Sequence, residues 1–495
     1  MKINWTRSLI LVIAVALFMG ANPSLWGQAT TWEQVPIPKL PEFNPQEPKR
    51  VVFPNGMVVF LQEDHELPLI DGTARIRGGD RDVPPAKLGL IDIYGEVWRT
   101  GGTKAQTGDQ LDDYLEQRAA KVETGGSVDS TTVSWSCLKE DFDDVFKVFV
   151  DLLQNPEFRV DKIGIAQKEL YDAISRRNDD PEQIADREAA KLAYGADNPY
   201  ARVAEYATVA AVTRQDLLDW HKAHVHPDSV VLGVTGDFDA AAMEAKLRAA
   251  FGPWARGPQS KREEPQGRIK PQPAKPGYYA VEKSDVNQSN IQMVALGTTR
   301  NDPDYYAIAV FNEAFGGGFS SRLFNEIRTG KGLAYAVGGG VGTAFDHQGM
   351  LRLMVMTKSQ STVESIQAVD EEIANLAKHP ISEGEIKRAK DSILNSFIFR
   401  LDSPGKIMQE QMTYEFYGYP LHFLQEFQKK IEIVTPADVA RVAAKYIHRD
   451  QMAVLVVGNS GEFDKPLSSL GPVTKIDITI PAPPPGIAAD QGAPQ

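Results

Sequence analysis

The amino-acid sequence predicts an α+β protein made of two homologous domains, in each of which helices pack on a mainly antiparallel sheet. Two observations lead to this fold class. One stretch of the chain is repeated later at a constant offset, and strand-like and helix-like segments alternate without the regular βαβ order of a parallel sheet. With 495 residues, the chain is also long enough for two domains.

The repeat relates residues 212–236 to residues 434–458. The first copy reads VTRQDLLDWHKAHVHPDSVVLGVTG and the second VTPADVARVAAKYIHRDQMAVLVVG, and they align without a gap. Each copy predicts a threonine-capped helix followed by a β-branched strand that ends in glycine. The same offset places Asp180 opposite Asp402, each near a proline after a helical stretch.

Further elements follow from hydrophobic periodicity. Alternating apolar residues predict strands at 57–62, 291–296 and 350–356, and apolar residues at helical spacing predict helices at 141–153 and 362–376. A looser correspondence relates a helix running from about Leu88 into Gly101-Gly102 to one running from about Tyr305 into Gly316–Gly318. Both halves of the chain are therefore expected to share one architecture.

The N-terminus has the features of a secretory signal. Lys2 and Arg7 precede an apolar run over 9–19, and Gly27-Gln28-Ala29 fits a signal-peptidase site. The apolar run is shorter than the roughly 20 residues that span a bilayer, which argues against a membrane anchor. We therefore expect cleavage after residue 29, no membrane span in the mature chain, and export to the periplasm or the medium.

Composition predicts the remaining boundaries. Residues 30–46 form an N-terminal extension, and the first repeat domain (the first half) covers 47–255. A linker rich in proline and basic residues covers 256–276, and the second repeat domain (the second half) covers 277–463. The proline-rich composition at the end of the chain predicts a disordered tail over 464–495.

Charge and cysteine content exclude several function classes. The formal net charge of −13 at pH 7 makes nucleic acid an unsuitable partner. Cys137 is the only cysteine, so neither an intramolecular disulfide nor a cysteine-based metal site can form. His221, His224 and His226 have an HxxHxH spacing, but their repeat positions keep only His448, which favours a packing role over a metal site.

Several motifs resemble the pitrilysin and mitochondrial-processing-peptidase family. They are Gly78-Gly79-Asp80-Arg81-Asp82, a helix ending in Thr100-Gly101-Gly102-Thr103, Asp179-Asp180-Pro181, Asn198-Pro199-Tyr200, and FGGGFSSRLFNEIRTGKGLAYAVGGG in the second half. Members of this family are zinc endopeptidases whose two homologous halves close like a clam shell around a peptide. The resemblance covers roughly residues 47–460 and implies the same arrangement here.

The resemblance also locates the family's HxxEH zinc motif, which this chain lacks. Asp92 and Glu96 occupy the two histidine positions, Gly95 occupies the position of the water-activating glutamate, and Ala173 occupies that of the distant ligand. Without imidazoles zinc loses its preferred ligands, and without a carboxylate at 95 no group takes a proton from the attacking water. We therefore expect no metal on this chain, although Asp92 and Glu96 leave a hard cation as a minor alternative.

In the second half the resemblance implies a substrate-contacting role. Arg322 and Tyr335 match the arginine and tyrosine that approach the scissile peptide, and such a pair suits stabilisation of an oxyanion. Gly316, Gly317 and Gly318 match a glycine-rich substrate-engaging loop. The alternatives are that Arg322 pairs with Glu326, that Tyr335 fills a core, and that the glycines form a tight turn.

Together these features predict the zinc-free, substrate-binding subunit of a periplasmic two-chain zinc endopeptidase acting on peptides or unfolded proteins. A homologous partner with an intact HxxEH would carry the zinc, and this chain would carry no cofactor. The alternative is a non-catalytic peptide-binding or scaffold protein of the same fold. A stand-alone peptidase with a site around Asp92 and Glu96 is the least favoured reading, because the whole ligand set is lost.

Overall fold

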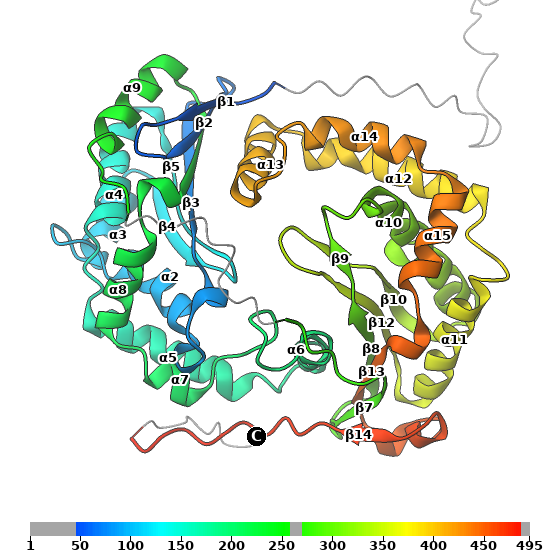
Figure 1. The fold of residues 1–495 in the computed structure, drawn as a ribbon. Helices are drawn as coiled ribbons and strands as arrows, with labels where there is room; N and C mark the ends of the chain where they lie inside the picture. Colours follow the sequence, from blue (N-terminus) through cyan, green and yellow to red (C-terminus); the bar gives the residue numbers. More distant parts are fainter. Residues whose placement is uncertain (1–45, 258–269, 487–495) are drawn as a thin grey trace, which may run out of the picture. The chain divides into compact units, whose positions relative to one another are not determined.

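The computed structural model describes residues 46–257 and 270–486 (Figure 1). The chain divides into Met1–Asn44 and Pro45–Gln495, and the fold below is that of the second unit. The expected signal at 1–29 lies outside the described residues, as do 30–45 of the extension, 258–269 of the linker and 487–495 of the tail. None of the helices in the described ranges is long and apolar enough to cross a membrane.

The first half forms a six-stranded sheet in the order β1-β2-β6-β3-β5-β4. Every neighbouring pair is antiparallel except β2 and β6, which are parallel. The strands are β1 (Lys49–Val52), β2 (Val58–Glu63), β3 (Leu69–Arg77), β4 (Lys121–Gly126), β5 (Ser130–Leu138) and β6 (Val230–Gly236).

The second half forms a six-stranded sheet of corresponding order, β10-β12-β8-β13-β7-β14. Its central pairs are antiparallel, whereas β7 runs parallel to both β13 and β14. The strands are β7 (Gly277–Glu282), β8 (Gln288–Leu296), β10 (Ala334–Gly340), β12 (Met350–Lys358), β13 (Ala453–Gly458) and β14 (Val473–Lys475), and β9 (Thr298–Thr299) pairs separately with β11 (Thr343–Ala344). The predicted α+β class with two homologous, mainly antiparallel domains is confirmed.

Helices pack against both sheets. Those of the first half are α2 (Leu90–Thr100), α3 (Gly108–Glu116), α4 (Phe142–Gln154), α5 (Val160–Arg176), α6 (Pro181–Tyr194), α7 (Tyr206–Ala210), α8 (Arg214–His224) and α9 (Ala240–Phe251). Those of the second half are α10 (Tyr305–Asn312), the π-helical segments η7 (Glu313–Gly317) and η8 (Phe324–Gly330), α11 (Thr362–Asn375), α12 (Glu383–Arg400), α13 (Pro404–Tyr417), α14 (Phe423–Ile433) and α15 (Pro436–Tyr446).

The repeated helix–strand unit has the same local chemistry in both halves. The Thr213 hydroxyl accepts a hydrogen bond from the Asp216 amide, and the Asp216 carboxylate accepts one from the Thr213 amide. Thr435 and Asp438 form the same capping box at α15. Each helix leads into a strand, β6 or β13, that is third from one end of its sheet. The sequence repeat is therefore a structural repeat.

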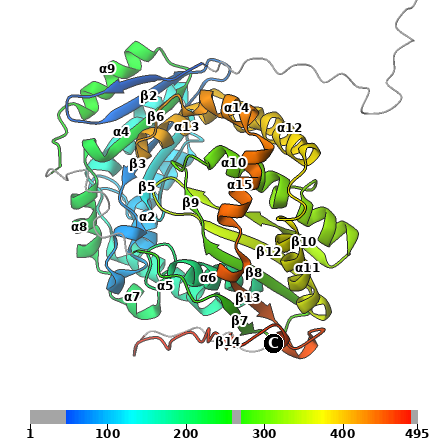
Figure 2. The same cartoon turned by 45° about the vertical axis from the view of Figure 1, so that its right-hand side comes forward.

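One helix of each half packs on the sheet of the other half. Helix α6, which follows the first-half motif at Asp180, packs on β8 and β13 of the second sheet (Figures 1 and 2). Helix α13, which follows Asp402, packs on β2 and β6 of the first sheet, where Met408 and Met412 contact Phe60 and Val231. The exchange ties the two halves together through apolar burial, the main stabilising force in folding.

Polar contacts reinforce the α13 crossing. The Arg75 guanidinium on β3 donates to the Tyr417 hydroxyl at 3.1 Å and lies 4.1 Å from the centre of the Phe416 ring. Arg50 on β1 binds Glu415 through two nitrogens, at 2.9 and 3.1 Å. A forked guanidinium–carboxylate pair fixes orientation as well as distance, so these contacts set the position of α13 on the first sheet.

The expected disordered tail from 464 needs correction. Val473–Lys475 forms β14 and pairs with β7, and the Ile476 amide continues the pairing by donating to the Ala280 carbonyl at 2.8 Å. Ile476 and Ile478 pack against the core of the second sheet, and Ile480 packs against the core of the first half. The prediction relied on the prolines further on and overlooked the alternating isoleucines of a strand-like segment.

Candidate functional site

Helix α2 carries three of the zinc-motif positions, Asp92, Gly95 and Glu96. Gly95 is buried against strand β4: a β-carbon built on it would stand 2.7 Å from the Gly126 nitrogen and 2.9 Å from the Gly125 carbonyl carbon. The Thr124 hydroxyl also donates to the Gly95 carbonyl. These neighbours are backbone atoms that cannot turn aside, so the structure leaves no room for a side chain at residue 95.

The carboxylates around α2 form an acidic group. Asp92 is exposed, yet partial desolvation by the surrounding protein raises its pKa. Desolvation also raises the pKa of Glu96, and the negative charge and hydrogen bond of Glu169 on α5 raise it further. Burial raises the pKa of Asp80, with a further contribution from the charge of Asp92. The raised pKa values mean that these three carboxyl groups bind a proton more readily than free carboxyl groups do.

Zinc does not fit this arrangement. No imidazole stands at the ligand positions, Ala173 is an exposed methyl group on α5, and the side chain of a water-activating residue has no space at Gly95. In the part of the chain that the structure describes, no cluster of three or more histidine, cysteine, aspartate or glutamate side chains is suited to holding a metal ion. The first half thus carries the helix of a metallopeptidase site without its chemistry.

The histidines of the HxxHxH stretch have packing partners. The Nε2–H of His221 donates to the Leu153 carbonyl at 3.1 Å, which leaves Nδ1 to accept from the Tyr94 hydroxyl at 2.8 Å. Burial lowers the pKa of His221 to about 4, so the ring is neutral near pH 7. His224 stacks on Trp220 with ring centres 3.7 Å apart. Both rings are engaged in the core of the first half.

In the second half, Arg322 pairs with Glu385 on α12 rather than with Glu326. Its Nε and Nη2 donate to the two Glu385 oxygens at 2.9 and 2.8 Å, and its remaining donors reach the carbonyls of His379 and Pro380. Burial opposes ionisation of Glu385, but hydrogen bonds from Arg322 and Ser382 outweigh it and lower the pKa of Glu385 to about 2. In this conformation Glu385 on α12 and two carbonyls of the segment just before α12 hold the guanidinium.

Tyr335 on β10 points into solvent instead of a core, since it is 72% exposed. It belongs to an exposed cluster of Phe319, Phe324, Arg328 and Tyr335, which we call the aromatic cluster. Phe319 is 81% exposed and meets Phe324 edge to face, and Arg328 lies 4.7 Å from the Phe324 ring centre and 5.8 Å from that of Tyr335. Exposed aromatic side chains with a neighbouring cation are common at binding surfaces.

The three glycines lie beside this cluster but play unequal roles. A β-carbon at Gly316 would stand 2.5 Å from the Gly339 carbonyl oxygen on β10, so this glycine permits a close backbone approach between η7 and the sheet. At Gly318 the nearest contact is the flexible end of Glu313, at 3.2 Å. None of the three has a positive φ, and Gly318 begins a turn in which its carbonyl accepts a hydrogen bond from the Ser321 amide at 3.0 Å.

Two residues that contribute to these sites, Glu169 and Glu385, were not predicted from the sequence. Glu169 lies one helical turn before Ala173 on the helix that supplies the family's distant ligand, and this spacing was a usable signal. Glu385 is 63 residues from Arg322 and gave no signal, because its pairing depends on how α12 packs beside η7.

Comparisons with known proteins agree with this geometry. Residues 211–393 match the family model described as the peptidase M16 inactive domain, and residues 96–201 match that of insulinase, peptidase family M16. An uncharacterized zinc protease of Mycobacterium leprae is 29% identical over 321 residues, which cover 63% of this chain and 70% of the relative. A non-peptidase homolog, YmxG, of Helicobacter pylori is 22% identical over 92% of this chain and 99% of its own.

Solved structures show the same fold. The peptidase M16 inactive domain of Pseudomonas fluorescens superposes with a TM-score of 0.74 at 22% identity, covering 84% of this chain and 98% of that chain. A protease from Helicobacter pylori gives a TM-score of 0.72 at 17% identity, covering 83% and 99%. The duplicated sheets, the family matches and the degenerate positions on α2 together show that this chain belongs to the insulinase (M16) peptidase family as a member that lacks the zinc motif.

Proposed function

We propose that this chain is the zinc-free, peptide-binding subunit of a two-chain zinc endopeptidase of the periplasm. A homologous partner with an intact HxxEH carries the zinc and the water-activating glutamate. This chain contributes a peptide-binding surface from its second half and no metal of its own. Its substrates are peptides or unfolded proteins.

The observation that carries the proposal is the packing of Gly95 against Gly125 and Gly126. A chain that merely lost its catalytic residue would keep a space for it, whereas here the backbone of β4 fills that space. Peptide hydrolysis therefore requires a metal and a base from another chain.

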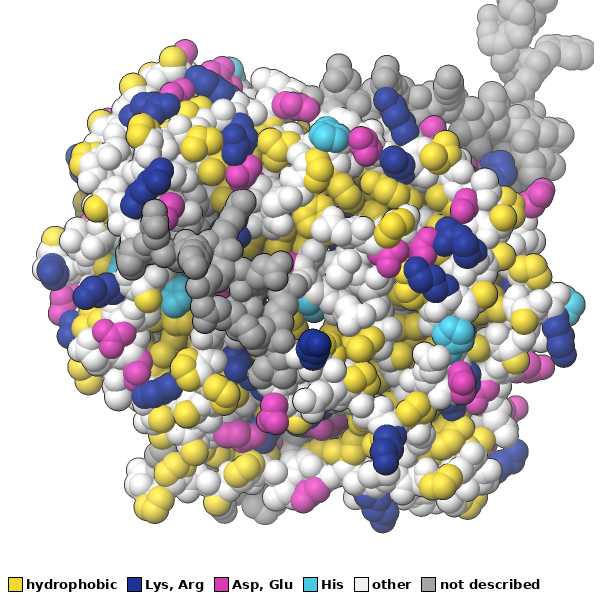
Figure 3. All heavy atoms as spheres, in the orientation of Figure 1, with side chains coloured by type: hydrophobic (Ala, Val, Ile, Leu, Met, Phe, Trp, Pro, Cys, Tyr) yellow, Lys and Arg dark blue, Asp and Glu magenta, His cyan; other side chains and the backbone are white. Residues whose placement is uncertain are grey.

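The aromatic cluster supports a binding role for the second half. Phe319 and Tyr335 are among the most exposed large apolar side chains in the described part of the protein, and β10 beside them is an edge strand. An edge strand presents unpaired backbone groups that an extended peptide can join, while neighbouring aromatic rings hold its side chains. On the face shown in Figure 3, acidic and basic side chains are interspersed instead of forming one basic patch.

A second candidate, a peptide-binding or scaffold protein with no peptidase partner, is favoured by one observation. The guanidinium of Arg322 is held by Glu385 and two carbonyls, so it contacts a substrate only after this pairing breaks. A scaffold needs no such rearrangement. The kinship with a protein named a non-peptidase homolog also suits this candidate.

The experiment is to purify the tagged mature chain from its own host and, separately, alone from a foreign host. Cleavage of a mixed fluorogenic peptide pool is then measured with and without a zinc chelator. The proposal expects chelator-sensitive cleavage, zinc and a second chain only in the host preparation. If neither preparation cuts while both bind the peptides, the scaffold role replaces it, and cleavage by the lone chain overturns both.

A further inference from the structure

Arg300 lies half-buried between β9 and α10, beside the short strand β11. Its backbone amide donates to the Ala344 carbonyl at 2.7 Å, which fixes the residue there. Within residues 46–257 and 270–486, no group accepts a hydrogen bond from its side chain or forms an ion pair with it, although its Nε is enclosed by protein. Four other arginines of these ranges have one enclosed nitrogen without a partner, but each is anchored through another nitrogen: Arg81, Arg99, Arg118 and Arg202. An enclosed donor that nothing anchors needs an explanation.

Aromatic rings surround the Arg300 guanidinium. Its central carbon lies 3.9 Å from the centre of the Phe345 ring and 5.5 Å from that of Tyr305. Phe345 is itself held in place, since it stacks on Tyr417 at 4.6 Å and meets Tyr419 edge to face. Rings attract a cation through their faces, but they do not replace the acceptors that the N–H groups in the guanidinium plane require. The rings therefore position Arg300 while its donors stay available.

Tyr305 and Arg400 add further donors to this place. Burial raises the pKa of Tyr305, and the charges of Arg300 and Arg400 oppose that rise, which means that both cations lie near the Tyr305 hydroxyl. Arg400 is exposed at the C-terminal end of α12. Two guanidinium groups and one phenol thus share one neighbourhood, which we call the Arg300 site.

The carboxylates close to the Arg300 site are bound to other donors. Glu410 on α13 accepts from the Tyr414 hydroxyl at 2.6 Å. Asp346, which follows Phe345, binds Arg81 of the first half. With Asp346 neutralised by Arg81, the charges of Arg300, Arg400 and Glu410 leave the site with one net positive charge.

These groups select the chemistry of a ligand. A planar guanidinium forks onto the two oxygens of a carboxylate, and a phenol adds a third donor. One net positive charge matches a carboxylate better than a phosphate group, which carries up to two negative charges. The rings of Phe345 and Tyr305 provide apolar surface for the carbon chain that bears the carboxylate.

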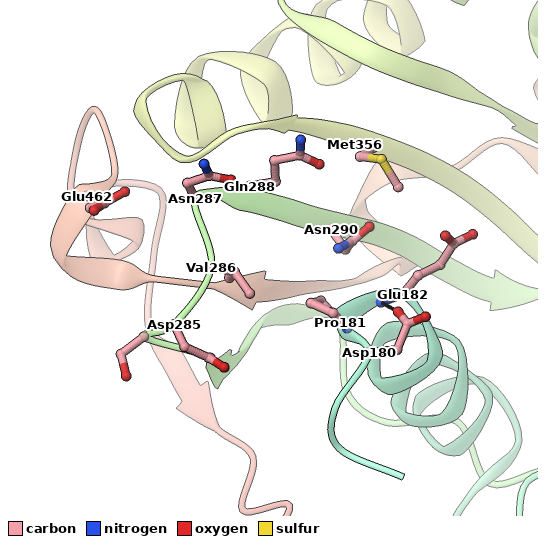
Figure 4. Close-up of a pocket in the computed structure, with 11 residues that line it drawn as sticks. Asp180, Pro181, Glu182, Asp285, Val286, Asn287, Gln288, Asn290, Met356 and Glu462 are labelled. Atoms are coloured by element: carbon pink, nitrogen blue, oxygen red, sulfur yellow. Dashed lines mark hydrogen bonds between the residues drawn. The ribbon is translucent and has the colours of Figure 1, made fainter. Parts of the chain in front are cut away.

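The pocket beside α6 is unsuited to the same ligand. Figure 4 shows Asp180 and Glu182 at the N-terminal end of α6 on one side of this pocket, and Asp285 and Glu462 on the other. All the charged side chains that line it are acidic, so they repel a carboxylate. Arg300 is not part of that lining. The Arg300 site therefore offers an anion what this larger pocket does not.

We propose that Arg300, Arg400 and Tyr305 form a binding site for a carboxylate group of a peptide. The inference rests on the peptide-binding role proposed above and adds a feature by which the peptide is recognised. The Arg300 fork holds the two carboxylate oxygens, the Tyr305 hydroxyl donates to one of them, and Arg400 contributes charge from the rim. The carboxylate is that of the peptide's C-terminus or of an acidic side chain, and the two sources are separated by experiment.

The first test compares three peptides by isothermal titration calorimetry on the full mature chain. They are acetyl-Ala-Ala-Phe with a free C-terminal carboxylate, the same peptide as its amide, and acetyl-Ala-Glu-Phe amide. The free acid is expected to bind about five- to tenfold more tightly than its amide, as for one charge-assisted, partly exposed pair. If the glutamate peptide binds as tightly as the free acid, the site accepts side-chain carboxylates; if it binds like the plain amide, the site reads the C-terminus. Equal affinity of all three peptides overturns the carboxylate site and leaves peptide binding intact, whereas failure of all three to bind overturns both.

The second test locates the carboxylate with matched variants. Arg300→Gln is expected to raise the Kd of the free acid to that of the amide, while the control Arg388→Gln, an exposed arginine at the other end of α12, should bind like the wild type. Equal affinities of these two variants for the free acid overturn the proposal.

Glu410→Gln makes the opposite prediction and guards against a folding defect in Arg300→Gln, which also loses the packing on Phe345. Glutamine can still accept from the Tyr414 hydroxyl, but it no longer repels the ligand. The Kd of the free acid should therefore fall about two- to threefold, while that of the amide stays unchanged. Weaker binding of the free acid to Glu410→Gln overturns the assignment of this site.

Discussion

Gly95 on α2 touches the backbone of Gly126 on β4 so closely that a β-carbon at residue 95 would stand 2.7 Å from the Gly126 nitrogen. The contact is reciprocal, because a β-carbon at Gly126 would meet the Ile91 side chain at 2.2 Å. The helix and the strand have thus closed on the place where a catalytic side chain would lie. A peptidase that had merely lost the side chain at this position would keep a space for it, and this structure has no such space.

Restoring the motif is therefore expected to fail. Gly95→Glu should lower the free energy of unfolding by roughly 2–4 kcal/mol, because the new side chain must push backbone aside. Adding Asp92→His, Glu96→His and Ala173→Glu should still give no stoichiometric zinc. The matched control is Gly164→Glu on α5, where a β-carbon meets no atom within 4 Å and a better helix former should be neutral or slightly stabilising. Urea unfolding measures the stability of these variants and metal analysis measures their zinc content. A stable quadruple variant that contains zinc would contradict the packing argument.

Arg322 and Glu385 allow a structural pair to be told from a substrate contact. Arg322→Ala and Glu385→Gln both break the pair, and each should cost roughly 1–3 kcal/mol of stability. Only Arg322→Ala also removes the guanidinium. If Arg322 serves a substrate, Glu385→Gln should keep or raise activity in the host preparation, whereas Arg322→Ala should lower it at least tenfold. Equal losses of activity in both variants would mean that Arg322 serves stability alone. Arg388→Ala on α12 is the control.

Gly316 and Gly318 are expected to respond differently to alanine. Gly316→Ala places a methyl group 2.5 Å from the Gly339 carbonyl and should cost roughly 1–3 kcal/mol. Gly318→Ala meets only the movable end of Glu313 and should be nearly neutral in stability. Thermal unfolding of the two variants measures this difference. A loop that works through flexibility would instead lose peptide binding in both variants without a difference in stability.

Arg75 is expected to matter for the attachment of α13 to the first sheet. Arg75→Ala removes the hydrogen bond to Tyr417 and the stacking over Phe416, and should destabilise the protein by about 2 kcal/mol. Limited proteolysis should then cut around α13 sooner than in the wild type. The exposed Arg388→Ala serves as the control and should change stability by less than about 0.5 kcal/mol. Matching behaviour of the two variants would show that Arg75 does not hold the crossing.

The desolvated ring of His221 predicts a loss of stability in mild acid. Burial lowers its pKa from 6.5 to about 4, so the unfolded chain takes up a proton first as the pH falls. The contribution of neutral His221 to the free energy of unfolding is fully present above pH 6.5. About 2–3 kcal/mol of it is lost as the pH approaches 4. His224, whose pKa burial also lowers, adds to the effect with the same sign. Urea unfolding from pH 7 to pH 4 measures this slope.

A glutamine at 221 provides the comparison. Its amide can donate to the Leu153 carbonyl and its oxygen can accept from Tyr94, so His221→Gln should show a flatter dependence on pH without a large loss at pH 7. His379→Gln, which changes an exposed histidine, should leave the slope unchanged. An unaltered slope in His221→Gln would assign the acid sensitivity to other groups.

The residues of the repeat were accessible from sequence because their interactions are local. Thr213 and Asp216 cap one helix and Thr435 and Asp438 cap the other through contacts three residues apart, so both the motif and its duplication can be read along the chain. The alternating Ile476, Ile478 and Ile480 were equally local, and the neighbouring prolines obscured them.

The sequence by itself determined the two-domain α+β fold, the family, and the loss of the zinc ligands at Asp92, Gly95, Glu96 and Ala173. Each of these depends on residue identity and spacing within one segment. Only the tertiary structure decided that β4 fills the space beside Gly95, that Arg322 is held by Glu385, and that Arg300 packs on the Phe345 ring. These pairings join segments far apart in sequence, and their partners are set by how helices and strands pack, which no local pattern encodes.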